Sequence, residues 1–313
     1  MKERIPQLDF LKGVFILLMV TFHLSLIDPM WKKAVYTFHM SAFLIISGYL
    51  ANVEKNLKDF TKGILRILVP YLLFESLYLL MVFFLGKTMH TTCSIRELTV
   101  LSFIDSIAEH PIGTYWYLHT LLICTCVYYI VYKAMKLTKM TALIIAGLAL
   151  YGLSVLLSGF KWSNSIYFLI GVCIMRSGRS FTETIPASGF AVLPLCILLA
   201  SPNNYVKGSL AGVSITLLVI SLLLFFFKYS TENIRRFFCY LGHNSLAIVV
   251  FSPIFTVATK LFIPFFRFDP TPLCFLAFSL SFVVTCSLFT AWLFDKIHLS
   301  RLIFLKKRIH VDF

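Results

Sequence analysis

Long apolar segments alternate with short polar ones along the whole chain of 313 residues. A helix needs about 20 mostly apolar residues to cross the hydrocarbon core of a bilayer. Such segments occur near residues 10–28, 34–51, 64–85, 114–132, 140–158, 163–176, 188–202, 208–227, 238–262 and 271–294, and the sixth and seventh of them are short. No long linker divides them. The pattern predicts an all-α integral membrane protein, a polytopic bundle of about ten transmembrane helices that forms a single membrane-embedded domain over residues 1–313.

The composition and the distribution of charge support this prediction. Hydrophobic residues make up 59% of the chain and charged residues 13%, whereas soluble domains have about 45–50% and about 25%. Twenty Lys and Arg lie in segments that a cytoplasmic N-terminus places inside, and eight lie in those placed outside. This asymmetry predicts an even number of spans with both termini cytoplasmic. It also accounts for the net charge of +14 without a nucleic-acid partner, because no basic stripe interleaved with aromatic residues is present.

Five ionisable residues lie inside the predicted spans: His23, His39, Arg66, Glu75 and His119. Placing a charged side chain at the centre of a bilayer costs about 2.5–3.5 kcal/mol on insertion scales, so each is a candidate functional residue. No Gly-rich phosphate loop, zinc-binding HExxH helix or GxSxG nucleophile motif is present. We therefore predict no metal, and the histidines are the best candidates for chemistry.

Lys12 and His23 occupy one face of the first predicted helix. They are eleven positions apart, which is three turns and about 16 Å of rise. A cavity along this face would have a cation at its mouth and, deep inside, an imidazole that can exchange a proton near neutral pH. The alternative is a core histidine bonded to a neighbouring helix, with Lys12 as an interfacial anchor.

The other candidates also have two interpretations. His39 serves either chemistry or interhelical hydrogen bonding. Arg66 either binds phosphate or extends to lipid headgroups. Glu75 pairs with a histidine, binds substrate or pairs with a cation on a neighbouring helix. Trp116 and Tyr117 either bind the substrate or belong to the aromatic belt that is expected in any case at the membrane interface where they are predicted to lie.

Several segments, taken in order, resemble the acyltransferase-3 family. DFLKGVFILLMVTFH is similar to its first span, FHMSAFLIISGYL to its second, RILVPY to its third-span Arg-x-x-x-Pro-Tyr pattern, and WYL to its Trp-Phe-Leu. LGHNSLAIVVFSP resembles the late Gly-x-Asn-Ser-Leu segment, in which we assign no role to His243. Members of this family are membrane proteins of about ten helices that move acyl groups from cytoplasmic acyl-CoA to carbohydrates and other acceptors.

The resemblance identifies His23 with the family's essential first-span histidine. Lys12 matches the basic residue eleven positions earlier, which is Lys in a sub-branch that includes fucose-acetylase-like members. Further motif positions are matched by Asp9, His39, Ser47, Gly48, Tyr49, Arg66, Trp116, Asn244 and Ser245. The chain departs from the pattern at Ser41, where Pro is usual, and at Ser252, where many members have histidine. We also expect no appended soluble domain of the hydrolase-like kind that some relatives have.

The resemblance implies a multi-pass O-acetyltransferase of the bacterial inner membrane that modifies polysaccharide of the cell envelope. Acetyl-CoA, or another acyl-CoA, would bind through Lys12 and Arg66. His23 would act as general base on a hydroxyl of a surface or lipid-linked carbohydrate, oriented by Glu75 or His39, or would carry the acyl group covalently. The rival class is a transporter or flippase for a glycan or a lipid-linked intermediate, and a third is a structural membrane subunit.

Overall fold

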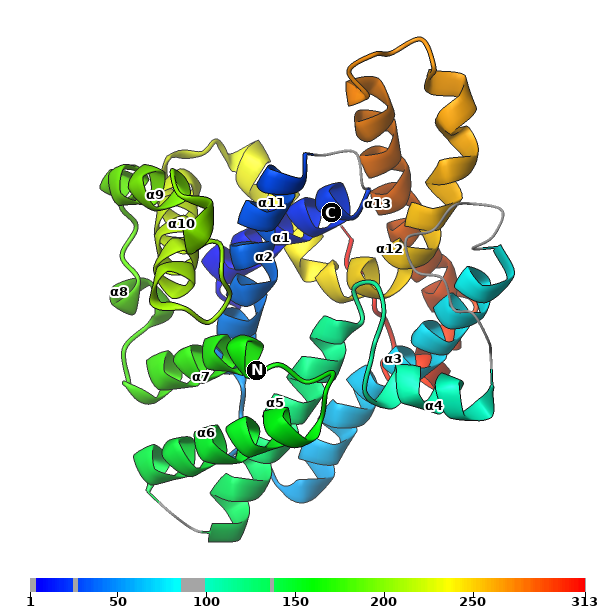
Figure 1. Ribbon diagram of the computed structural model, residues 1–313. Coiled ribbons are helices and arrows are strands. Elements are labelled where there is room, and N and C mark those ends of the chain that lie inside the picture. The colour runs from blue at the N-terminus through cyan, green and yellow to red at the C-terminus, as the bar shows by residue number, and fades with distance from the viewer. Residues whose placement is uncertain (1–3, 25–27, 86–98, 136–137, 313) are drawn as a thin grey trace.

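A computed structural model describes residues 4–24, 28–85, 99–135 and 138–312, and within these ranges every regular element is a helix (Figure 1). The first half contains α1 (Pro6–His23), α2 (Pro29–Leu50), α3 (Leu57–Leu85), α4 (Val100–Ala108), α5 (Trp116–Met135), α6 (Lys139–Leu156) and α7 (Trp162–Arg176). The second half contains α8 (Phe181–Thr184), η1 (Gly189–Ala191), α9 (Val192–Leu199), η2 (Pro202–Asn204), α10 (Leu210–Tyr229), α11 (Glu232–His243), α12 (Ser245–Thr259), η3 (Lys260–Phe266), α13 (Leu273–Lys296) and α14 (Leu299–Ile303).

Every predicted span overlaps a helix, but two of the predicted boundaries are wrong. The segment 238–262 is not one helix, because α11 ends at His243 and α12 begins at Ser245. The segment 188–202 contains only the eight residues of α9 as α-helix, about 12 Å of rise, which is too short to cross a bilayer. Residues 25–27, at the end of the first predicted span, lie outside the described residues.

Five helical segments in the described ranges are long and apolar enough to cross a membrane. They are Pro6–His23, Leu57–Phe84, Leu210–Tyr229, Ser245–Phe266 and Leu273–Lys296. The total of ten spans remains a prediction. The last two of these segments form a hairpin that projects from the rest of the molecule (orange in Figure 1).

Glycines bring two pairs of helices into direct backbone contact. A Cβ atom on Gly48 of α2 would lie 2.0 Å from the carbonyl oxygen of Phe168 in α7, and one on Gly171 of α7 would lie 2.0 Å from the carbonyl oxygen of Ile45. In the same way, a Cβ on Gly13 of α1 would lie 1.9 Å from a carbonyl oxygen of α11. Small residues of this kind allow close helix packing in membranes. They fix α1 against α11 and α2 against α7.

Replacing Gly171 with alanine is expected to destabilise the bundle by about 1–3 kcal/mol, because its methyl group must push α7 away from α2. The thermal unfolding midpoint of the protein in detergent measures this loss. The matched control is Gly152→Ala in α6, where nothing lies within 4 Å of the added Cβ and no loss is expected. Equal unfolding midpoints for the two variants would contradict this packing.

The N-terminal end of α1 and the last described residues lie at the same end of the bundle. Asp9 of α1 contacts His243 at the end of α11, and the adjacent Asn244 is hydrogen-bonded to Val311. We call this the Lys12 end, because Lys12 lies there, and the opposite end of α1 the His23 end. The N-terminus of α2 follows α1 at the His23 end. Which end faces the cytoplasm remains a prediction.

Candidate functional site

His23, the last residue of α1, is held by its own helix. Its Nδ1 donates a hydrogen bond to the carbonyl oxygen of Met19 at 2.7 Å. A carbonyl can only accept, so Nδ1 carries the proton of the neutral ring and Nε2 carries the lone pair. The side chain lines a cavity of about 240 Å³ together with Lys32, Tyr36 and Ser252. The ring is thus fixed to its own helix through Nδ1 and lies beside this cavity.

Ser252 contributes a buried hydroxyl to the wall of the same cavity. The residue is 1% exposed, and its Oγ has no hydrogen-bond partner among the described residues. The sequence singles out this position only as a departure from the family pattern. The structure places it on the same cavity as His23.

His39 of α2 repeats the geometry of His23. Its Nδ1 donates to the carbonyl oxygen of Val35 at 2.7 Å, and its Nε2 is buried without a hydrogen-bond partner in the part of the chain that the structure describes. The ring of Tyr36 lies between the two histidines, with centroid distances of 5.6 Å to His23 and 5.3 Å to His39. His39 therefore lies near His23 but does not hydrogen-bond to it.

Glu75 of α3 is completely buried and holds the segment that leads into α5. Its Oε1 accepts a hydrogen bond from the backbone N–H of Ile112 at 2.8 Å. The following residues, Gly113 and Thr114, line the His23 cavity. Glu75 therefore shapes the wall of that cavity and does not bond to His23. The remaining buried candidate, His119, bonds the carbonyl oxygen of Ala108 at 2.9 Å and joins α5 to α4.

At the other end of α1, the carboxylate of Asp9 accepts hydrogen bonds from two side chains. Its Oδ1 accepts from Lys12 Nζ at 2.6 Å, and its Oδ2 accepts from His243 Nε2 at 2.8 Å. Asp9 is thus an orienting residue at the Lys12 end, far from His23. His243, to which the sequence assigns no role, completes this group because α11 packs on α1.

A second cavity, of about 500 Å³, opens at the Lys12 end. Four basic side chains line it: Lys12, Lys55, Arg66 and Lys306. Ser245 contributes to the same wall. The sequence predicts Lys12 and Arg66 for this role. It gives no signal for Lys306, which lies almost 300 positions from Lys12 along the chain.

The C-terminal segment is bound to this end by backbone hydrogen bonds, which position Lys306. The side-chain amide of Asn244 donates to the carbonyl oxygen of Val311 at 3.0 Å and accepts from its N–H at 2.9 Å. Arg66 Nε donates to the carbonyl oxygen of Leu305 at 3.3 Å, and Asp295 accepts from the N–H of Ile309 and its neighbour. The motif residue Asn244 therefore has a structural role in holding this segment over the cavity.

Trp116 and Tyr117 lie between the two ends. The hydroxyl of Tyr117 shares a hydrogen bond of 2.8 Å with Ser47, and Tyr117 lines the cavity of the Lys12 end. The ring of the adjacent Trp116 packs under Lys207, whose Nζ is 4.5 Å from the ring centroid. Tyr117 thus belongs to the basic cavity, whereas its neighbour Trp116 contacts Lys207.

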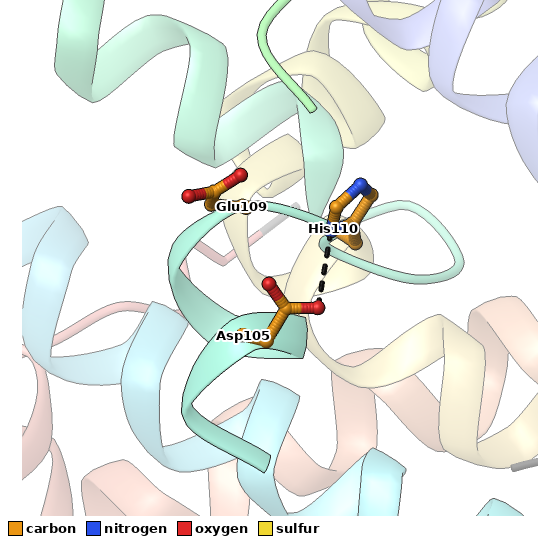
Figure 2. A group of neighbouring side chains, drawn as sticks. All are labelled: Asp105, Glu109 and His110. Atoms are coloured by element: carbon orange, nitrogen blue, oxygen red, sulfur yellow. Dashed lines mark ion pairs between the residues drawn. The ribbon is translucent and has the colours of Figure 1, made fainter. Parts of the chain in front are cut away.

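An exposed group of Asp105, Glu109 and His110 has the composition of a metal site (Figure 2). Both ring nitrogens of His110 already have partners, however. Nδ1 lies 3.3 Å from Asp105 Oδ2, the pair dashed in Figure 2, and Nε2 lies 3.0 Å from Ser158 Oγ, which also bonds Glu109. Gly159 follows Ser158 and packs against the backbone of Glu109. We assign this group to the docking of α4 on the loop before α7.

Comparison with known proteins decides the family of this chain. The profile of the acyltransferase-3 family, described as an acyltransferase domain, matches residues 5–292. The chain belongs to the acyltransferase-3 family. That match covers both cavities except the C-terminal segment with Lys306. No solved structure matches the chain.

Two curated relatives share sequence with part of this acyltransferase-3 member. It is 33% identical over 128 residues to the nodulation protein NolL of Sinorhizobium fredii, which covers 36% of this chain and 33% of the relative. It is 31% identical over 124 residues to the nodulation protein NolL of Mesorhizobium japonicum, covering 35% and 31%. The matched segments span about a third of the length of these relatives.

Proposed function

We propose that this protein transfers an acetyl or other short acyl group from cytoplasmic acyl-CoA to a hydroxyl of a carbohydrate or glycolipid, with His23 as general base. One observation carries the proposal: His23 lines a cavity at one end of α1, and a cavity with four basic side chains lies at the other. Membership of the acyltransferase-3 family supports the reaction class.

The basic cavity suits the donor. Acyl-CoA carries several phosphate charges, and Arg and Lys side chains are the usual partners of phosphate. Arg66 bonds the carbonyl oxygen of Leu305 and so lies next to Lys306, and Lys12 is held in place by Asp9. Three cations supplied by three separate segments could hold a bulky polyanion better than a single lysine that extends to the lipid surface.

The distance along α1 suits the arm of the donor. Lys12 and His23 are separated by about 16 Å of helix rise, so an extended pantetheine arm is needed to bring the thioester to the imidazole. Phe43 and Tyr117 line the basic cavity on the side toward the middle of the bundle. In this proposal the arm passes these two rings.

The chemical step transfers one proton and exchanges two bonds. Nε2 of His23 takes the proton of the acceptor hydroxyl as its oxygen attacks the thioester carbonyl carbon. The new C–O bond forms, the C–S bond breaks, and the imidazolium returns the proton to the thiolate. In the alternative route Nε2 attacks first and forms an acyl-histidine, which the acceptor hydroxyl then cleaves.

Thioester consumption tests the proposal. Purified protein in lipid vesicles is supplied with radiolabelled acetyl-CoA, and free CoA and labelled product are separated by chromatography. Membranes from cells that make the protein provide the acceptor. An acyltransferase releases CoA in step with label appearing on an alkali-labile ester. A transporter or flippase moves glycan across the vesicle membrane and leaves the thioester intact, and that outcome would refute the proposal.

A further inference from the structure

Lys32, Lys161 and Lys207 lie at the His23 end and are not part of the proposed donor site. Lys32 lines the His23 cavity, with its Nζ 5.5 Å from the ring centroid of Tyr36. Lys207, in the loop before α10, lies over Trp116. Trp116 comes two positions after Thr114, which lines the His23 cavity, so Lys207 lies beside the wall of that cavity. Lys161, just before α7, is in turn close enough to act on Lys207.

The described carboxylates at this end have other partners. Asp28 accepts from the N–H of Met30, Glu75 accepts from Ile112, and Asp105 and Glu109 belong to the group with His110. Among the described residues, none of the carboxylates forms an ion pair with Lys32, Lys161 or Lys207. Within the described part of the protein, the positive charge of these lysines beside His23 is therefore not held in any direct ion pair.

Lys207 is the most informative of the three. Its side chain is partly buried against Trp116, and this burial, with the charge of Lys161, lowers the pKa of Lys207 to about 8. A lysine that serves only to contact lipid headgroups would extend to the surface and stay fully solvated. Holding a partly desolvated ammonium near other cations is unfavourable unless an anion binds there.

We propose that the acceptor is an anionic saccharide, bearing a carboxylate or phosphate, and that Lys207 and Lys32 bind that group while a hydroxyl of the same molecule faces His23. The inference rests on the proposed function and adds the chemical class of the acceptor. Opposite charge draws the acceptor to this end of the bundle, and the two lysines orient it. The sugar ring then lies over the cavity of about 240 Å³.

The test uses matched sugars that differ in charge. Full-length protein in phosphatidylcholine nanodiscs is treated briefly with a reductive methylation reagent, and the modification of each lysine is read by mass spectrometry. Glucose 1-phosphate, glucuronic acid and glucose are added separately at equal concentration. The first two are expected to protect Lys207 and Lys32 several-fold, and glucose is expected to protect neither. Equal protection by glucose would overturn the proposal.

Substitutions of the lysines distinguish the loss of a positive charge from a disturbance of the fold. Lys207→Met is expected to weaken binding of glucose 1-phosphate, measured by calorimetry, about tenfold or more. Lys207→Arg keeps the charge and is expected to retain most of the affinity. The matched control is Lys33→Met, because Lys33 is exposed on the same helix as Lys32 and its loss should leave binding unchanged. The same loss in Lys33→Met as in Lys207→Met would contradict a specific site.

The phosphate of a lipid headgroup is the other anion that could bind to Lys207 and Lys32. Labelling is therefore repeated in dodecyl maltoside, a detergent without phosphate. If nanodisc lipid protects Lys207 and added glucose 1-phosphate gives no further protection, the site binds lipid and the anionic acceptor is refuted. Binding of acyl-CoA at the Lys12 end and consumption of its thioester are measured separately. If Lys207 and Lys32 bind the anionic sugar but no thioester is consumed, the proposed acyl transfer is refuted and the anion site is not.

Discussion

Replacing His23 with alanine is expected to slow acyl transfer by about 10²–10⁴-fold, because the reaction loses its general base. Binding of acyl-CoA should be nearly unchanged, since the basic cavity lies at the opposite end of α1. The rate is measured as CoA released from radiolabelled acetyl-CoA, and the product as alkali-labile acyl groups counted by mass spectrometry on the glycans of cells that carry each variant.

The control for this experiment is His298→Asn. His298 is exposed and adopts a left-handed backbone (φ 60°), which asparagine tolerates well, so this variant should fold and turn over normally. If His23→Ala keeps full ester formation at normal protein levels, His23 is not the base. If esters persist while the surface amount of glycan falls, the transporter interpretation replaces the acyltransferase.

Replacing Arg66 with methionine is expected to raise the KM for acyl-CoA about 10–100-fold with a much smaller change in kcat, because the side chain contacts the donor's phosphates in ground and transition state alike. Steady-state kinetics with varied acetyl-CoA measures both constants. The loss should also shrink with increasing salt, since screening weakens contacts between charges at an open cavity.

Lys62→Met is the matched control for Arg66. Lys62 lies one turn earlier on α3, is exposed and does not line the basic cavity. Arg66 also bonds the carbonyl oxygen of Leu305, so Arg66→Lys is needed to separate the charge from the anchoring of the C-terminal segment. A fall in kcat with unchanged KM for Arg66→Met would place Arg66 outside the donor site.

The residues of the first spans could be predicted because their signal is local. Lys12 and His23 share one helix, and the spacing of eleven residues sets them on one face whatever surrounds them. The ion pair between Asp9 and Lys12 is also local, being formed across three positions of the same helix. The structure keeps both residues on one helix and shows the ion pair, but Lys12 and His23 line two separate cavities and not the single cavity that the spacing predicts.

Other features could not be predicted from spacing. The sequence suggests Glu75 or His39 as the group that orients His23, but α1 itself supplies that partner through Met19. A backbone carbonyl four residues earlier is present in every helix and leaves no mark in the pattern of side chains. Likewise, Asn244 stands at the break between α11 and α12 and bonds Val311, which lies 67 positions away.

The sequence by itself determined that this is a membrane protein, that it is helical and to which family it belongs. The length of the apolar segments, the charge asymmetry and the ordered motifs are all properties of neighbouring residues. Only the tertiary structure decided which distant side chains share a cavity. It brought His243 to the Lys12 end because α11 packs closely on α1, and it brought Lys306 to the basic cavity because distant side chains bind the backbone of the C-terminal segment.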